Sequence, residues 1–259
     1  MKVGVVMPIG PQEGTNVVPG WEATRLAALA TEEAGFDSAR VYDHLLFRFG
    51  TDPTQGIHEA WTILSAIASI TSRVELGILV LAMPFRSPAL LAKMAATFEE
   101  VSGGRLILGV GCGWHEPEFD AFGFPFDHRV GRFEEALEIM VPAVRSGRAT
   151  FSGRWHSATD LEVLPTYSRP DGEPTPILIA GAGPRMMQLV ARHADAWNTA
   201  WLGPASQLPP RLEPLRAALA EAGRDPASLE ITVGINVVLP EFADAEHPPL
   251  EITPSTITG

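Results

Sequence analysis

The chain has 259 residues, of which 46% are hydrophobic, a formal net charge of -12 and a single cysteine. This acidic balance argues against nucleic acid and against an anionic membrane surface as partners, because both select for basic proteins, so a small molecule is the expected ligand. One cysteine excludes an internal disulfide, no Cys/His cluster has zinc-ligand spacing, and no stretch approaches the roughly 18 uninterrupted apolar residues of a membrane span, which together predict a metal-free cytoplasmic protein.

The first half of the chain alternates short apolar runs with helical patterns. A β-branched run over residues 2–7 reads as a first strand and not as a signal peptide, because no cleavage-like site follows it. Three further strands are predicted from the apolar runs at residues 38–42, 74–81 and 106–110. Helices with apolar residues at helical spacing are predicted between them, beginning at about residues 21, 58 and 88.

The second half continues the alternation after one interruption. A helix is predicted over residues 129–145. The stretch 148–175 is rich in Gly, Pro, Ser and Thr and is expected to leave the core, with room for one hairpin. Beyond it, strands are predicted at 176–180, 196–199 and 229–239, and helices at 184–193 and 210–222.

This alternation of strands and helices predicts a parallel sheet with helices outside it. Seven strands in order favour a (β/α)8 TIM-type barrel over a doubly wound sheet, in one domain over residues 1–259. The chemistry of such a barrel lies at the carboxyl ends of its strands, so the residues that follow the strands are the candidate site residues.

The end of the chain leaves little for an eighth strand. Only residues 251–259 remain for it, so we expect a barrel that is shortened at its C-terminal end. The opening would expose the edges of the strands at 2–7 and 229–239, which are rich in valine and isoleucine and therefore prone to pair with another chain. We expect either a fragment of a longer protein or a dimer that buries the gap.

Asp43 and His44 directly follow the second predicted strand. A histidine beside a carboxylate can exchange a proton near neutral pH, with the carboxylate orienting the ring or stabilising its charged form. His115 and Glu116 follow the fourth strand in the same plane, so the carboxyl of Glu116, or that of Glu118, is expected to face the imidazole. His44, Asp43 and Glu116 are the candidate catalytic residues. The alternative is that His44 is a hydrogen-bonded structural histidine.

The stretch SGGRLILGVGCGWHE, residues 102–116, joins an apolar strand to a glycine-rich turn. Without side chains at Gly111 and Gly113, a flat ligand can approach the end of this strand closely. The alternative is a buried strand that ends in a tight turn.

The stretch GAGPRM, residues 181–186, is a glycine turn that leads into a helix. Backbone N–H groups and the helix dipole favour a bound phosphate there, and tight strand-to-helix packing is the alternative. The dinucleotide pattern G-x-G-x-x-G is not completed, because Met186 stands in its last position, and the glycines near Gly109 fail in the same way at Trp114.

Five segments of the chain carry a resemblance to a known family. They are VGVVMP near the start, GFDSARVYDHLL at 35–46, LGILVLAMPFRSP at 76–88, SGGRLILGVGCGWHEPEFDAFG at 102–123 and PILIAGAGPRMMQLVARHADAWN at 176–198. In this order they resemble the bacterial luciferase-like monooxygenase family, and more narrowly its branch of F420-dependent oxidoreductases. The resemblance implies a (β/α)8 barrel that binds FMN or the deazaflavin F420 at the carboxyl ends of its strands, and members that are often dimers.

The same resemblance implies roles for individual residues. His44, with Asp43 beside it, would accept or donate a proton next to the cofactor ring. The ring would lie against Val80, where a non-proline cis peptide is expected between Leu79 and Val80. Its other surroundings are implied to be a floor of Gly111, Cys112 and Gly113, a wall at Trp114, and a phosphate site at Gly181, Gly183 and Arg185.

From these patterns we expect an oxidoreductase that moves a hydride between a small organic substrate and F420, with FMN as the alternative cofactor. Reduced FMN would permit oxygen activation and monooxygenation instead. A catalytically silent flavin-binding protein is the interpretation from another class. The expected partners are a small-molecule substrate and a second copy of the chain, with no nucleic acid, membrane or metal.

Overall fold

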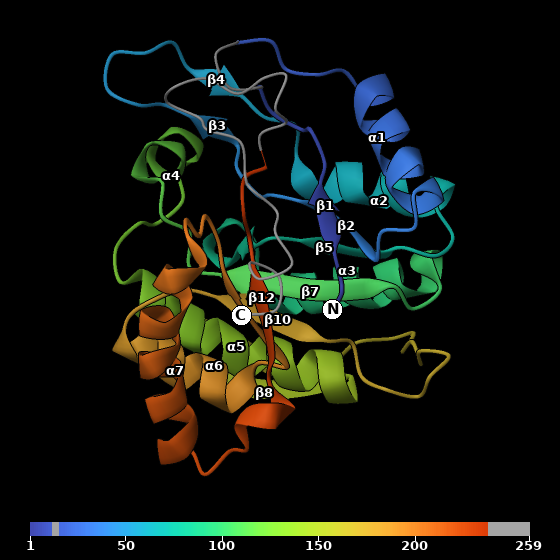
Figure 1. Cartoon of the computed structure of the whole chain (residues 1–259). Helices are drawn as coiled ribbons and strands as arrows, with labels where there is room; N and C mark the ends of the chain where they lie inside the picture. The colour runs from blue at the N-terminus through green and yellow to red at the C-terminus, as the bar shows by residue number, and fades with distance from the viewer. Residues whose placement is uncertain (12–15, 238–259) are drawn as a thin grey trace. The chain divides into compact units, whose positions relative to one another are not determined.

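The computed structural model describes residues 1–11 and 16–237 (Figure 1). The chain divides into two parts, residues 1–180 and residues 181–259, and each part is described by itself. The single domain predicted over residues 1–259 stays a prediction. The strand considered for residues 251–259 lies outside the described residues.

The first part is built on a parallel sheet whose strands follow the order of the chain. The strands are β1 (Gly4–Val6), β2 (Ser38–Val41), β5 (Glu75–Ile78), β7 (Leu106–Gly111) and β10 (Ile177–Ala180). Val5 lies opposite Ala39, and Gly77 lies opposite Ile107. Most residues of β2, β5, β7 and β10 are buried, as expected for parallel strands that are covered on both faces.

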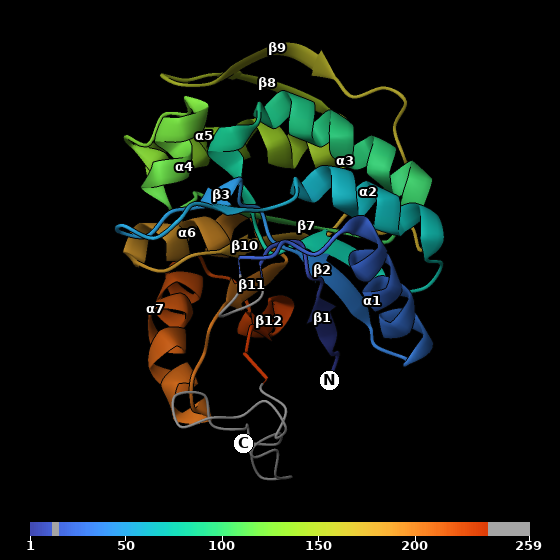
Figure 2. The same cartoon turned by 90° about the horizontal axis from the view of Figure 1, so that it is seen from above.

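Four helices of the first part alternate with these strands, as predicted. They are α1 (Trp21–Glu33), α2 (Ala60–Ile70), α3 (Pro88–Ser102) and α5 (Arg129–Ser146), and Figure 2 shows them following one side of the sheet. Their ends follow local signals. Ser87 is the N-cap of α3 with Pro88 in the first turn, and Gly147 ends α5 in the left-handed conformation, at φ 72°.

Several short elements interrupt this alternation. The predicted strand at 74–81 is split into β5 and β6 (Leu81–Ala82), which pairs with β7, and the 3-10 turn η1 (Met83–Phe85) follows. β3 (Leu46–Phe47) pairs with β4 (Gln55–Gly56). The hairpin predicted within 148–175 is confirmed as β8 (Arg148–Ser152) and β9 (Ser157–Glu162). The short helix α4 (Glu116–Phe122) is not among the elements expected from the sequence.

The second part contains α6 (Pro184–His193), β11 (Ala196–Thr199), η2 (Ala205–Gln207), α7 (Leu208–Glu221), η3 (Pro226–Ser228) and β12 (Glu230–Val233). β11 and β12 are parallel, with Ala196 opposite Glu230. The predicted helices and the predicted strand at 196–199 are confirmed. The strand predicted over 229–239 ends earlier, at Val233. None of the helices in residues 1–11 and 16–237 is both long and apolar enough to cross a membrane.

A partly buried carboxylate at the end of α1, that of Glu32, binds the turn between α2 and β5. Both oxygens of Glu32 accept hydrogen bonds from the backbone N–H groups of Ser72, Arg73 and Val74, at distances of 2.7 to 3.0 Å. Burial alone would raise the pKa of Glu32, but the hydrogen bonds from Val74, Arg73 and Ser72 outweigh it and lower the pKa to about 2. The charged form of Glu32 therefore stabilises the fold.

We expect Glu32→Gln to lower the free energy of unfolding at pH 7, because an amide accepts fewer hydrogen bonds than a carboxylate. The folded-state pKa lies below the ordinary value of 4.5, so the contribution is present above about pH 4.5 and is lost as the pH falls towards 2. Urea unfolding of both proteins between pH 7 and pH 3 measures the difference. Glu33→Gln, at the exposed neighbouring position, is the control, and a difference that does not shrink in acid would contradict this account.

Candidate functional site

The carboxyl ends of β2 and β7 bring two polar segments together. β2 leads into Asp43 and His44, and β7 leads through a glycine turn into α4. β5 lies between β2 and β7 in the parallel sheet, so both carboxyl ends lie at the same edge. Beyond that edge, α4 lies beside β3 (Figures 1 and 2). This contact brings His44 next to a residue 74 positions away in the sequence.

Glu118 is the carboxylate that contacts His44. Its Oε1 lies 2.9 Å from Nδ1 of His44, and its Oε2 accepts the backbone N–H of Leu45 at 2.8 Å. Glu118 is only 1% exposed, so a carboxylate without these partners would be costly there. His44 itself is partly exposed. The alternative carboxylate considered from the sequence is therefore the one that the fold places against the imidazole.

The expected pairing of Glu116 with the imidazole is wrong. Glu116 lies exposed in the first turn of α4, and no hydrogen bond joins it to His44 in the part of the chain that the structure describes. The physical reason is the helix itself. Successive side chains of a helix point about 100° apart, so Glu116 and Glu118 cannot face the same neighbour.

The expectation that Asp43 orients the imidazole is also wrong. Both oxygens of Asp43 bind the guanidinium of Arg86, at 2.6 and 3.0 Å, and Oδ2 also accepts the N–H of Ala82 at 2.8 Å. Arg86 donates a further bond to Glu59, which is the N-cap of α2. Because both oxygens of Asp43 are engaged in this ion pair, its carboxylate holds the loop after β5 and makes no hydrogen bond to the imidazole within the described residues. A role of Asp43 in stabilising the charged form of the ring stays a prediction.

His115 anchors the segment that follows His44. Its Nε2 accepts the backbone N–H of Arg48 at 3.0 Å, and the residue is buried. Burial lowers the pKa of His115, the carboxylate of Glu118 opposes this, and His44 and Arg48 lower the pKa further. The neutral ring is the form that can accept this hydrogen bond, so His115 is a structural partner of the segment that follows β3.

Aromatic rings surround His44 on its open side. The ring of Phe47 lies 4.4 Å from the imidazole, and Trp114 meets the imidazole edge-on at 5.4 Å. Phe49 stacks on Phe47 at 5.6 Å and lies parallel to Trp114 at 6.4 Å. Trp114 is 57% exposed and Phe49 48% exposed. The sequence predicts a wall at Trp114. Phe47 and Phe49 are not predicted from it, and their signal is the alternation in Phe47-Arg48-Phe49.

The glycines of the predicted floor, Gly111 and Gly113, pack closely against other parts of the protein. The non-proline cis peptide between Leu79 and Val80 is confirmed. A Cβ added at Gly111 would lie 2.9 Å from the Val80 side chain, and one added at Gly113, where φ is 71°, would lie 2.6 Å from the ring of Phe119. Close packing of the protein itself therefore requires these two glycines. Room for a flat ligand is not needed to explain them.

Cys112, between these glycines, is partly buried. Burial raises the pKa of its thiol, and the nearby charge of Arg129 opposes this only in part. The Cys112 side chain is therefore a neutral thiol near pH 7, with no property of an activated nucleophile. It remains a candidate only for contact with a ligand.

In the second part, the turn before α6 has the open geometry expected of an anion site. Gly183 has a φ of 90°, and an added Cβ would meet nothing within 4 Å. It is the N-cap of α6, with Pro184 in the first turn and no side chain capping the helix. Arg185 is exposed in that first turn, and the carbonyl of Gly181 accepts the indole N–H of Trp197 at 3.1 Å.

A buried polar atom follows in the same part. Asn198, on β11, donates from Nδ2 to the hydroxyl of Thr232 at 2.8 Å. Its Oδ1 is buried and has no hydrogen-bond partner within residues 1–11 and 16–237. A buried acceptor without a donor is unusual in a folded protein, and a ligand that brings a donor would satisfy it.

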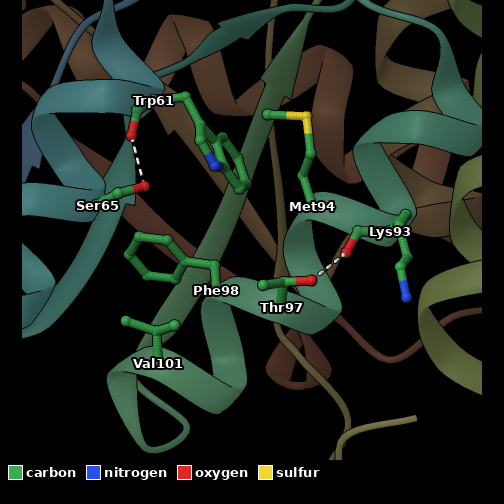
Figure 3. Close-up of a pocket in the computed structure, with 7 residues that line it drawn as sticks. All are labelled: Trp61, Ser65, Lys93, Met94, Thr97, Phe98 and Val101. Atoms are coloured by element: carbon green, nitrogen blue, oxygen red, sulfur yellow. Dashed lines mark hydrogen bonds between the residues drawn. The ribbon is translucent and has the colours of Figure 1, made fainter. Parts of the chain in front are cut away.

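A separate groove lies between α2 and α3, with a volume of about 220 Å³. Figure 3 shows its lining residues: Trp61, Ser65, Lys93, Met94, Thr97, Phe98 and Val101. The side-chain polar atoms of Ser65, Thr97 and Lys93 are already engaged. Ser65 and Thr97 donate to backbone carbonyls of their own helices, and Lys93 donates to the carbonyl of Leu164. The groove is therefore a mainly apolar surface without a free acid, base or nucleophile.

Across the described residues, no group of three or more His, Cys, Asp or Glu side chains could hold a metal ion.

The sequence of the chain matches a known protein family. The luciferase-like monooxygenase family matches residues 1–246. The chain is 36% identical over 178 residues to a phthiodiolone/phenolphthiodiolone dimycocerosates ketoreductase of Mycobacterium tuberculosis, covering 66% of this chain and 45% of that protein. It is 34% identical over 177 residues to an F420-dependent glucose-6-phosphate dehydrogenase of Amycolatopsis mediterranei, covering 66% and 50%. The chain thus spans about half the length of these curated relatives.

A solved structure shares the fold. An F420-dependent secondary alcohol dehydrogenase in complex with an F420-acetone adduct matches with a TM-score of 0.73 at 23% identity, covering 90% of this chain and 68% of that chain. Together with the parallel strands and alternating helices, this match confirms the predicted class, a TIM-type (β/α)8 barrel.

The buried pair of Asp43 and Arg86 gives a stability prediction. We expect Asp43→Ala to lower the free energy of unfolding by about 3 kcal/mol, because the largely buried guanidinium of Arg86 keeps only Glu59 as a carboxylate partner and the N–H of Ala82 loses its acceptor. Asp127→Ala removes a surface ion pair with Arg132 and should cost less than about 1 kcal/mol. Urea unfolding at pH 7 compares the two variants. Equal, small losses would mean that Asp43 does not hold the loop after β5.

Proposed function

Because the chain belongs to the luciferase-like monooxygenase family, we propose that it acts as an F420-dependent oxidoreductase, with FMN as the alternative cofactor. It transfers a hydride between the cofactor and a small organic substrate. The observation that carries this proposal is His44, a partly exposed imidazole that a buried carboxylate holds at the catalytic edge of a parallel sheet. We propose F420 as the cofactor because one of the chain's relatives is an F420-dependent glucose-6-phosphate dehydrogenase.

The residues present fit a cofactor that has a flat ring and a phosphate. His44 and the exposed ring of Trp114 provide a proton donor or acceptor and an aromatic surface next to it. In residues 181–237, the open space at Gly183 fits an anion, and the unpaired Oδ1 of Asn198 fits a ligand donor. We assign ring contacts to Val80, Gly111, Cys112, Gly113 and Trp114, and phosphate contacts to Gly181, Gly183 and Arg185.

The proposed reaction converts a secondary alcohol and a ketone into each other. Bound F420 would supply the hydride donor or acceptor. As the alcohol becomes a ketone, Nε2 of His44 would accept the proton of its hydroxyl. In the reverse direction, His44 returns the proton to the carbonyl oxygen. The substrate class draws on the ketoreductase and the alcohol dehydrogenase that the chain resembles.

The aromatic side chains around His44 position the substrate. Trp114, Phe47 and Phe49 offer ring faces and edges, and these favour an apolar or planar substrate over a strongly charged one. They also limit the access of water to the imidazole, which strengthens any hydrogen bond that the substrate makes there.

Two other functions remain as alternatives. With reduced FMN, the same site would carry out monooxygenation, which the name of the family favours. A flavin-binding protein without turnover is the alternative from another class. We further propose one domain, a homodimer and a cytoplasmic location. Molar mass from light scattering tests the dimer, and a monomer at micromolar concentration would contradict it.

Fluorescence titrations with F420 and FMN, followed by turnover assays, test the proposed function. We expect tighter binding of F420, and equal or tighter binding of FMN would favour the monooxygenase alternative. His44→Gln should lower turnover of a secondary alcohol or ketone by about 10²- to 10⁴-fold while cofactor affinity stays within several-fold. His128→Asn, which changes an exposed histidine in the left-handed conformation, is the control. Unchanged turnover in His44→Gln would remove His44 from the mechanism.

The proposed phosphate site has its own test. Gly183→Val places a side chain in the open space beside α6, and we expect cofactor affinity to fall by about 10-fold or more, or about 1.4 kcal/mol. Gly172→Val is the matched control, because Gly172 also has a positive φ, 77°, and open space around it. Both variants place a valine at a positive φ, so a loss of affinity confined to Gly183→Val, in protein that remains folded, identifies the site. Equal affinities in the two folded variants would contradict the assignment.

A further inference from the structure

The two oxygens of Glu118 receive different hydrogen bonds, and this difference determines the proton position on His44. Oε2 accepts from a backbone N–H, that of Leu45, which can only donate. Oε1 lies 2.9 Å from Nδ1 of His44. A carboxylate has no hydrogen to donate, so the contact is a hydrogen bond only when Nδ1 carries the hydrogen.

We propose that Glu118 is a positioning residue that holds neutral His44 in the Nδ1–H tautomer, with Nε2 as the proton acceptor. A neutral imidazole carries one hydrogen, so fixing it on Nδ1 leaves the lone pair on Nε2. No hydrogen bond to Nε2 is formed within the described part of the chain, and the side chain is partly exposed. Nε2 is therefore the atom available to a substrate hydroxyl.

The other neighbours of His44 do not compete for its nitrogens. Phe47 and Trp114 contact the imidazole through their rings. The ring centroid of His115 lies 6.4 Å away, and its Nε2 is engaged by the N–H of Arg48. Glu118 is thus the side chain that decides the tautomer among the residues that the structure describes.

Replacing the carboxylate by an amide reverses the pattern. In Glu118→Gln, the N–H of Leu45 still needs an acceptor, so the amide oxygen must face Leu45 and the amide NH2 must face Nδ1 of His44. The opposite orientation sets two donors against each other. Nδ1 then becomes the acceptor, the hydrogen moves to Nε2, and the substrate meets a donor in place of an acceptor.

Nuclear magnetic resonance of the cofactor-free protein tests this directly. Long-range ¹H–¹⁵N spectra at about pH 8, with His44 assigned from the spectrum of His44→Gln, report which ring nitrogen is protonated. We expect Nδ1–H in the wild type and Nε2–H in Glu118→Gln. Glu116→Gln, which makes the same change on an exposed turn of the same helix, should leave the wild-type tautomer. Nε2–H in the wild type, or Nδ1–H in Glu118→Gln, would overturn the proposal, and the wild-type result does not depend on any variant folding.

The consequence for catalysis rests on the proposed function, whereas the tautomer does not. We expect Glu118→Gln to lower turnover of a secondary alcohol by about 10²- to 10⁴-fold, and the double variant with His44→Gln to lose little more, because both act on one proton transfer. Additive losses would show that Glu118 does not act through His44. If the tautomers are as expected but His44→Gln keeps full turnover, the function fails and the tautomer assignment stands.

Discussion

The buried carboxylate of Glu118 is the contact on which the candidate site depends. It joins the segment after β2 to the helix after β7 through one side-chain and one backbone hydrogen bond. A charge at 1% exposure is tolerated only when both of its oxygens are satisfied, so the backbone at Leu45 and the ring of His44 must both keep their places. The position of the imidazole is therefore set by the fold before any ligand binds.

Other buried ionic contacts hold the surroundings of this pair. Asp43 and Arg86 tie the end of β2 to the loop after β5 and, through Glu59, to the start of α2. Nε2 of His115 accepts the backbone N–H of Arg48, between Phe47 and Phe49, and so holds the segment that carries these two rings. Each of these groups bonds a different element, so a shift of His44 would break several contacts at once. Such rigidity is what an acid-base group needs to meet its substrate in one geometry.

The strands, most helices and the site's edge could be predicted from the sequence, because apolar periodicity is local and strand ends follow it. The choice of carboxylate could not. Asp43 is adjacent to His44 in the sequence, but its side chain points to Arg86 and not to the imidazole. The carboxylate that contacts His44 belongs to Glu118, which is 74 positions away in the sequence. The helix that carries Glu118 is only seven residues long, and its signals are a proline at the start and Gly123 at the end. The sequence predicts that a side chain is excluded at Gly111 and Gly113. It does not predict the reason, because Val80 and Phe119, which leave no room for a Cβ there, are distant in the sequence.

Under the proposed function, the residues that hold the reactive histidine differ from those that would contact the substrate. Glu118, Asp43 and His115 are buried and bonded to backbone or to ions, so changing them disturbs the fold and the reactive group together. Trp114 and Phe49 are about half exposed and make only ring contacts with their neighbours. A substitution at these two positions changes the surface that a substrate meets and leaves the hydrogen bonds of His44 intact. Under the proposed function, the same acid-base arrangement would therefore serve different substrates, because selectivity would reside in side chains that the fold does not need.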